Sequence, residues 1–150
     1  MENQVNPTRN DNPVWLKTYE ELGLTYDINM PPENSSLIDI FEKSFAEFSN
    51  RTAFICMGAS ISFQEVDEYS KQVAVYLQSL GLTKGDKVAV MMPNLLQTPV
   101  TILGILRAGC VVVNVNPLYT VRELEHQLND SESSAIFILA NFADTLEKAL

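Results

Sequence analysis

The chain has 150 residues, of which 46% are hydrophobic and 19% are charged, and its formal net charge at pH 7 is −9. This length and composition indicate one folded domain and exclude an intrinsically disordered chain. The charge balance argues against a nucleic-acid partner, because the 10 Lys and Arg residues form no basic tract.

Residues 1–34 are a polar, proline-rich segment, and we expect an extended leader that wraps over the surface. Four of the seven prolines lie here, and Trp15 is the expected anchor. No apolar stretch follows a basic start, so no secretory signal is predicted. Residues 35–150 are expected to be the N-terminal part of a larger α/β domain that is truncated at Leu150.

At the front of this domain, the sequence pattern predicts a helix, a small hairpin and a second helix. The first helix covers residues 37–49 after an N-cap at Ser36, and the hairpin covers residues 53–62. Ser62 and Glu65 then predict a capping box for a helix that runs to about Leu80. The expected buried stripes of the two helices are Leu37, Ile40, Phe41, Phe45 and Phe48, and Val66, Tyr69, Val73, Leu77 and Leu80.

Three apolar strands follow, over residues 87–92, 110–115 and 135–140, and a helix is predicted after each of them. The expected caps of these helices are Asn94, Thr120 and Asn141. Continuous apolar runs are typical of parallel strands that are covered on both faces. The predicted fold class is therefore α/β, a parallel βαβαβα layer with right-handed crossovers, preceded by a helix and a small β-hairpin. The third strand leaves a sheet edge that nothing in the sequence covers, as expected for the front piece of a larger protein.

Polar residues recur where the strands end, namely Asn94, Asn114, Asn116 and Asn141. Ligands bind at this edge of open α/β sheets, but Asn is also a leading helix cap. We favour capping and keep ligand binding as the alternative. No phosphate-cradling motif can be built from the six glycines.

The remaining candidates for chemistry are single residues. His126 is the only histidine, and without a nucleophile partner it is interpreted as a surface or packing residue; a zinc site is excluded. Cys56 and Cys110 are interpreted as two buried thiols of a cytosolic protein rather than as a disulfide. Arg107 is explained by the dipole at a helix C-terminus, with a buried ion pair as the alternative.

Several of these segments together resemble one family. They are Gly85–Asn94 (GDKVAVMMPN), Gly104–Gly109 (GILRAG), Val113–Thr120 (VNVNPLYT) and Arg122–Asp130 (RELEHQLND). The chain resembles the N-terminal part of a bacterial long-chain fatty acid–CoA ligase, of the adenylate-forming (AMP-binding) superfamily. The fold that this resemblance implies is the N-terminal portion of the adenylate-forming enzyme fold.

The resemblance implies a reaction for the full-length enzyme. Fatty acid and ATP, with magnesium, form an acyl-adenylate, and the acyl group then passes to coenzyme A. The family's phosphate loop, magnesium ligand, ribose-binding Asp and lid lysine are not in this sequence and would lie beyond Leu150. The implied catalytic, cofactor-binding and metal residues of this segment are therefore none, and the segment alone is expected to be inactive.

Three functional hypotheses follow, in this order. The first is the front segment of a ligase whose partners are long-chain fatty acid, ATP, CoA and the remainder of the same polypeptide. The second is a stand-alone association module that pairs with a ligase or with itself as a homodimer. The third is a small module that binds a nucleotide through Asn94 or Asn116. The expected location is the cytoplasm, since no secretory signal is predicted and residues 95–115, which contain Arg107, do not predict a spanning helix. The fatty-acid substrate that the resemblance implies suggests peripheral contact at the inner membrane as an open alternative, although the segment shows no basic amphipathic anchor.

Overall fold

The computed structural model describes residues 14–23 and 36–150, which belong to two units, residues 1–33 and 34–150. In the first unit, helix α1 spans Val14–Glu21. The sequence analysis placed no helix in the leader. The rest of the leader and the side chain of Trp15 lie outside the described residues, so the wrapping leader and its anchor stay predictions.

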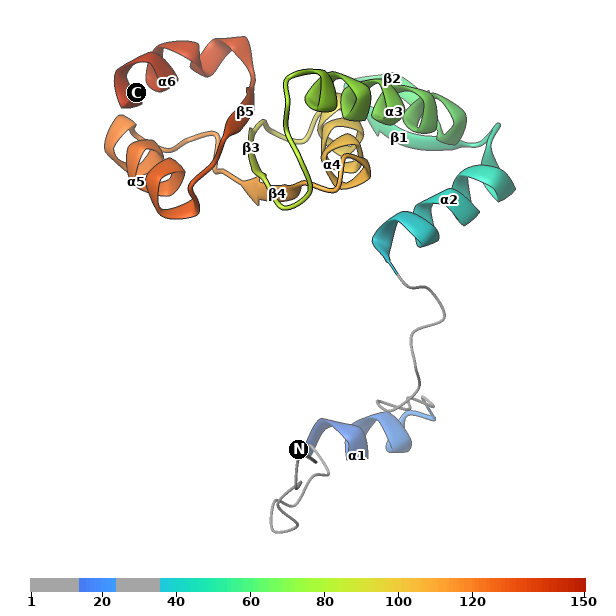
Figure 1. Cartoon of the computed structure of the whole chain (residues 1–150). Coiled ribbons are helices and arrows are strands. Elements are labelled where there is room, and N and C mark those ends of the chain that lie inside the picture. Colours follow the sequence, from blue (N-terminus) through green and yellow to red (C-terminus); the bar gives the residue numbers. More distant parts are fainter. Residues whose placement is uncertain (1–13, 24–35) are drawn as a thin grey trace, which may run out of the picture. The chain divides into compact units, whose positions relative to one another are not determined.

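The described part of the second unit contains the helix, the hairpin and the three βα pairs in the predicted order (Figure 1). The elements are α2 (Leu37–Phe48), β1 (Thr52–Cys56), β2 (Ala59–Ser62), α3 (Phe63–Ser79), β3 (Lys87–Met91), α4 (Gln97–Arg107), β4 (Val111–Asn114), α5 (Val121–Ser131), β5 (Ala135–Ile138), the 3₁₀ turn η1 (Ala140–Phe142) and α6 (Ala143–Ala149).

Strands β3, β4 and β5 form a parallel sheet in the order β4-β3-β5, which confirms the predicted parallel α/β layer. The central strand β3 is buried from Val88 to Met91. The two edge strands are less covered than their apolar sequences suggested, and Val111 of β4 is 46% exposed. Apolar runs thus predicted the type of sheet, while the position of each strand in it decided the burial.

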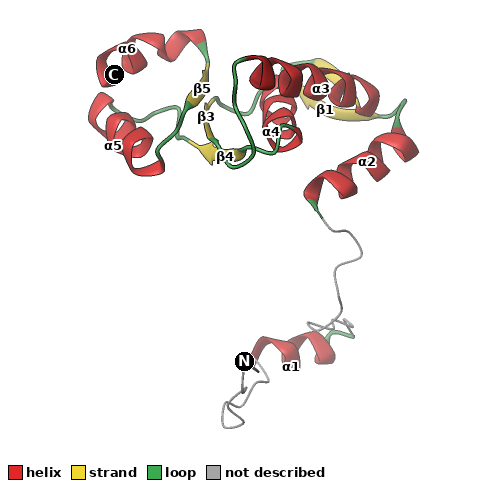
Figure 2. Cartoon of the chain, in the orientation of Figure 1, coloured by secondary structure: helices red, strands yellow, loops and turns green. Residues whose placement is uncertain are grey.

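The helices cover the two faces of this sheet in pairs. On one face, α3 and α4 pack on Val88 and Val90 of β3 and on Phe137 of β5. On the other face, α5 and α6 pack on Ala89 and Met91 of β3. Figure 2 shows the strands lying between the two helix pairs. Successive side chains of a strand point to opposite faces, so β3 contributes alternate residues to two separate cores.

The β1–β2 hairpin forms as predicted and closes a third core. Its strands are antiparallel, and Met57 and Gly58 both have positive φ, as a two-residue hairpin turn requires. Ile61 of β2 packs with Phe45 of α2 and with residues of α3 and α4. The hairpin is therefore fastened to the helices rather than to the parallel sheet.

Three predicted helix caps are confirmed and two are wrong. Ser36 caps α2, because its hydroxyl accepts the Asp39 amide at 3.1 Å. Ser62 and Thr120 each form a complete capping box, with Glu65 and Glu123 respectively. Asn94 and Asn141 cap no helix. Helix α4 starts at Gln97, later than predicted, since Thr98 Oγ1 donates to the Pro93 carbonyl (2.6 Å) and accepts from the Leu95 amide (3.3 Å).

The buried stripes of α2 and α3 also differ from the predicted ones. In α3 the buried residues are Val66, Ser70, Ala74 and Leu77, whereas Tyr69 and Leu80 are exposed. In α2 only Phe45 is buried, and Leu37 and Ile40 are exposed. A helical period identifies an apolar side, but the packing partner selects which part of that side is buried.

The small residue Gly104 allows α3 and α4 to approach closely. A Cβ atom at this position would lie 2.4 Å from Val73 Cγ1 and 2.9 Å from the Ser70 carbonyl oxygen. The Ser70 side chain is itself fully buried and donates to the Asp67 carbonyl. Glycine is thus required at the contact between the two helices.

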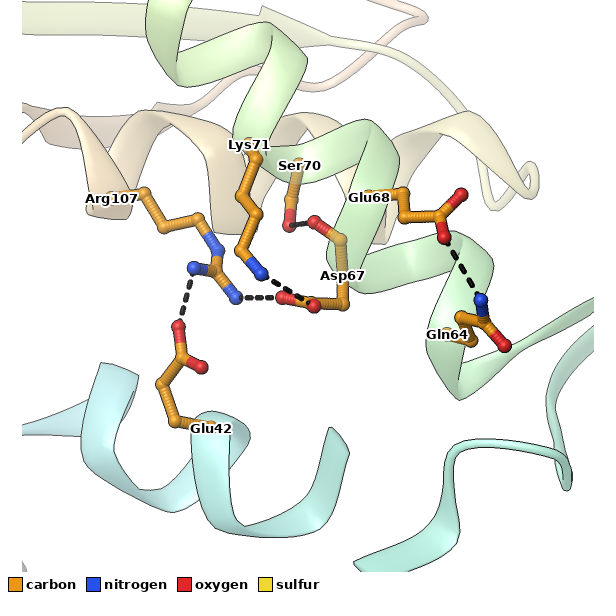
Figure 3. Close-up of polar contacts among 7 residues, drawn as sticks. All are labelled: Glu42, Gln64, Asp67, Glu68, Ser70, Lys71 and Arg107. Atoms are coloured by element: carbon orange, nitrogen blue, oxygen red, sulfur yellow. Dashed lines mark hydrogen bonds and ion pairs between the residues drawn. The ribbon is translucent and has the colours of Figure 1, made fainter. Parts of the chain in front are cut away.

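Arg107, at the end of α4, ties helices α2, α3 and α4 together (Figure 3). Its guanidinium donates to Glu42 of α2 and, over 2.6 Å, to Asp67 of α3, and it lies 5.5 Å from the centroid of the Phe45 ring. The Arg107 side chain is 10% exposed. The alternative of an ion pair is confirmed, but the pair is only partly buried, since the side chains of Asp67 and Glu42 are 20% and 46% exposed. The dipole alone does not explain this residue.

We predict that Gly104→Ala destabilises the chain. Alanine favours a helix by about 1 kcal/mol, but the clash with the Ser70 carbonyl and Val73 outweighs this, and we expect a net loss of about 1–2 kcal/mol. Urea denaturation followed by circular dichroism measures the change. In a Val73→Gly background the same substitution should cost less, because both of the shortest contacts, to Val73 Cγ1 (2.4 Å) and Val73 Cβ (2.5 Å), are then absent. Equal costs in both backgrounds would contradict the steric explanation.

The two capping boxes should make stability depend on acid pH. Hydrogen bonds from the backbone and hydroxyl of Ser62 lower the pKa of Glu65 from its ordinary 4.5, and Thr120 lowers the pKa of Glu123 likewise. Such a carboxylate stabilises the fold above its unfolded-state pKa, and this contribution is lost as the pH falls through the lower folded-state pKa. We expect the double variant E65Q/E123Q, which retains acceptors but does not titrate, to lose less stability than the parent in urea titrations from about pH 5 to about pH 3. If the double variant and the parent showed the same pH dependence of stability, the two capping boxes would not be its cause.

Removal of Arg107 should loosen helix α2. Arg107→Met leaves Asp67 paired with Lys71 but removes the ion pair between Arg107 and Glu42, and we expect a loss of about 1–3 kcal/mol, since the guanidinium is mostly buried. The matched control is Lys71→Met, which breaks a more exposed pair with the same Asp67 and should cost about 0–1 kcal/mol. Denaturation midpoints give both values. Similar losses for the two variants would show that Arg107 is no more than a surface charge.

Candidate functional site

The carboxyl ends of the three parallel strands are the first place to look for a ligand site. Register pairs Val90 with Asn114 and Met91 with Ile138, so the strands end at one edge of the sheet. Asn94, Asn114, Asn116 and Asn141 all follow this edge and all are exposed. Asn116 is used in the turn, because its Oδ1 accepts the Leu118 amide at 3.0 Å.

The donor set at this edge does not fit magnesium or a triphosphate. Magnesium prefers carboxylate and phosphate oxygens, and a triphosphate needs adjacent backbone N–H groups or cations. The strand ends supply amide side chains. Among the residues that the structure describes, no group of three or more His, Cys, Asp and Glu side chains lies together to hold a metal ion. No catalytic step is therefore derived from these residues.

His126 lies exposed on α5 beside an open depression of about 560 Å³. Thr120, Arg122 and Glu123 also line it. Thr120 and Glu123 are engaged in the capping box, and His126 has no nucleophile partner within the described residues. This geometry agrees with the interpretation of His126 as a surface residue.

Both cysteines are free thiols, as predicted, but their environments differ. Cys110 is buried, and its Sγ donates to the Thr83 carbonyl at 3.5 Å. Burial, with a smaller contribution from the Asp86 carboxylate, raises the pKa of Cys110 above its ordinary 9.0. The thiolate is the reactive form of cysteine, so this residue is suited to packing. Cys56 is half-buried rather than buried as predicted, because it lies at the end of the β1 strand of the hairpin, and its Sγ donates to the Asn94 carbonyl at 3.4 Å.

An apolar hollow of about 350 Å³, which the sequence analysis did not identify, lies between β1 and the start of α4. Its walls are residues 54–56, residues 94–96 and Thr98, Pro99 and Ile102. The polar groups here are already bonded, namely the Cys56 thiol to the Asn94 carbonyl and the Thr98 hydroxyl to the Pro93 carbonyl. The sequence feature that could have identified this hollow is Thr98-Pro99. Proline favours the first turn of a helix, so Pro99 indicates that α4 starts later than directly after Asn94.

Arg107 is the one largely buried cation among the candidate residues, and its charge is paired with carboxylates of the same domain. Its two terminal nitrogens meet the carboxylates of Glu42 and Asp67, while Lys71 pairs with the second oxygen of Asp67 (Figure 3). An anionic ligand would have to displace these carboxylates. We therefore assign Arg107 a structural role.

No helix in the described ranges 14–23 and 36–150 has the length and apolar character needed to cross a bilayer.

Comparison with known proteins connects this scaffold to one family of enzymes. The family model described as "AMP-binding enzyme" matches residues 41–150. A long-chain fatty acid–CoA ligase of Escherichia coli O6:H1 is 56% identical over 138 residues, which are 91% of this chain and 24% of that protein. The corresponding ligase of Bacillus subtilis is 40% identical and is matched over 83% of this chain and 22% of its own length. The chain thus spans about a quarter of the length of these relatives.

Solved structures show the same fold at lower sequence identity. An anthranilate–CoA ligase in complex with anthranoyl-AMP superposes with a TM-score of 0.73 at 24% identity, over 78% of this chain and 23% of that one. A fatty acyl-CoA synthetase of Mycobacterium tuberculosis gives a TM-score of 0.68 at 23% identity, over 72% and 22% of the two chains. With the family match over most of its length, the chain belongs to the AMP-binding, adenylate-forming enzyme family.

Proposed function

We propose that the chain is the front segment of a long-chain fatty acid–CoA ligase. The observation that carries this proposal is the 56% identity over 138 residues to the Escherichia coli ligase, of which the matched part is 24%. Within the resemblance described above, the VNVNPLYT and RELEHQLND segments of this chain favour the long-chain ligases.

The proposed reaction of the whole protein has two steps. The fatty acid carboxylate attacks the α-phosphate of ATP and releases diphosphate, and the coenzyme A thiol then displaces AMP from the acyl-adenylate. Both steps need neutralisation of phosphate charge, which magnesium and cationic side chains supply. The described residues do not fit that task, so we place it in the remainder of the polypeptide.

The role that we propose for residues 36–150 is to shape and support the larger domain. The Thr120 capping box fixes where α5 begins, and Arg107 fastens α2 to α3 and α4. On this proposal the segment alone is inactive, and its partners are the remainder of the same polypeptide and, through it, fatty acid, ATP and CoA.

The proposed location is the cytoplasm, with the inner membrane surface as the source of an apolar substrate. Two free thiols agree with a reducing compartment. The described helices carry no basic amphipathic face that would anchor the segment to anionic lipid, so contact with the membrane would have to come from other parts of the protein.

The second candidate is an association module that pairs with a ligase or with itself. The observation that favours it is the pair of open sheet edges, at β4 and β5, in the described part of the chain. This candidate predicts a mass that increases with concentration in light scattering. A chain that stays monomeric at high concentration would remove it.

The first test is the intact mass of the native gene product, followed by an acyl-CoA synthesis assay. We expect a mass several times 16.8 kDa, and ATP-dependent formation of acyl-CoA from a long-chain acid such as oleate. Acetate should serve as a poor-substrate control, and the isolated 150-residue chain should show only background turnover. A native mass near 16.8 kDa would contradict the proposal that the chain is a segment of a longer ligase and would favour the association module. Turnover by the isolated chain would contradict its inactivity.

A further inference from the structure

The turn of the β1–β2 hairpin carries a methionine that its backbone does not favour. Met57 and Gly58 are the two turn residues, since Cys56 pairs with Ala59 across the strands. Met57 has a φ of +50° and Gly58 a φ of +82°. The first position of such a turn favours Asn, Asp or Gly, because other side chains are strained at positive φ. Local conformation therefore gives no reason for methionine at this position.

Packing gives no reason for this methionine either. Met57 is 95% exposed. The hairpin is anchored by Ile61 of β2, which lies in a core with Phe45. Because this anchor and the two-residue turn fix the hairpin, the exposure of Met57 is a feature of the fold.

The other methionines that the structure describes are much less accessible. Met91 lies on the central strand β3 and is fully buried. Met92 is half-buried and packs against the core between α3, α4 and the sheet. An oxidant must reach the sulfur atom to react with it, so these two residues provide internal controls for Met57.

The two cysteines do not offer a comparable sulfur. Cys110 is buried, and Cys56 is half-buried with its thiol donated to the Asn94 carbonyl. Within residues 14–23 and 36–150, Met57 is thus the most exposed sulfur-containing residue. Thioethers react with peroxides without prior ionisation, whereas cysteine must first lose its proton.

We propose that Met57 is a site of reversible oxidation by peroxide. The sulfur attacks one oxygen of hydrogen peroxide and forms a sulfur–oxygen bond as the oxygen–oxygen bond breaks. The proton on the transferred oxygen moves to the leaving oxygen, which departs as water, and the sulfur is oxidised by two electrons. A methionine sulfoxide reductase reverses the step, in which the sulfoxide oxygen leaves as water and two thiols become a disulfide.

The position of Met57 makes this oxidation harmless to the fold. Sulfoxide formation turns an apolar side chain into a polar one, which disrupts a core but not a solvated turn. The oxidised side chain of Met57 stays in solvent, and Ile61 continues to anchor the hairpin. The inference depends on the hairpin alone and does not rest on the proposed function.

The test is treatment of the intact native gene product with hydrogen peroxide, followed by mass spectrometry of its peptides over time. We expect the sulfoxide of Met57 to form at least about tenfold faster than those of Met91 and Met92. In concentrated urea the three residues should react at similar rates, because the fold no longer protects two of them. If Met57 of the folded protein reacts as slowly as Met91, the turn is covered in the native product and the proposal is wrong.

The matched control is Met57→Leu, because Cys56 lies in the same peptide. We expect the variant to lose the rapid mass gain of one oxygen atom in this peptide. A gain that persists would lie on the Cys56 thiol and would overturn the assignment to Met57.

Reversibility and its effect on stability are measured on the oxidised protein. A methionine sulfoxide reductase with dithiothreitol should remove the oxygen from Met57, and the urea midpoint should be the same before and after this reduction. A sulfoxide that the reductase leaves in place, or a midpoint that falls on oxidation of Met57 alone, would overturn the proposal of a reversible and harmless modification.

Discussion

Burial of β3 on both faces is the constraint on which the rest of the described domain depends. Val88 and Val90 face α3 and α4, and Ala89 and Met91 face α5 and α6. A parallel strand in this position needs helices on both sides and crossovers long enough to contain them. The alternation of helices with strands and the two separate cores on the faces of the sheet follow from that one requirement.

The part of the domain farthest from β3 is held by different means. The hairpin and α2 do not pair with the parallel sheet, and they pack instead around Ile61 and Phe45. Arg107 adds charge-assisted hydrogen bonds from α4 to both α2 and α3. Gly104 brings α3 and α4 close enough for this to happen. Two residues of the GILRAG segment therefore have a packing explanation, and neither needs a ligand.

The same view explains the segments on which the family resemblance rests. The recognisable motifs lie on the central strand β3, at the end of α4, and across the turn, cap and body of α5, where packing and backbone geometry restrict the choice of residue. Thr120 and Glu123 close a capping box, and Asn116 forms a turn with Leu118. Such residues identify the fold, while the chemistry that we propose for the whole protein needs charged groups that the strand ends of this segment do not present.

The amino-acid sequence by itself determined the type and order of the elements from residue 36 onward, the parallel sheet, the hairpin and two capping boxes. These features depend on local patterns, namely apolar periodicity, turn residues and a Ser or Thr three residues before Glu. Tertiary structure alone decided which side of α3 is buried, where α4 starts, and that Arg107 joins residues 65 and 40 positions away in the chain. It also placed β3 between β4 and β5. These outcomes depend on contacts between segments distant in the sequence, and no local pattern specifies which of several apolar or charged partners comes to lie in contact.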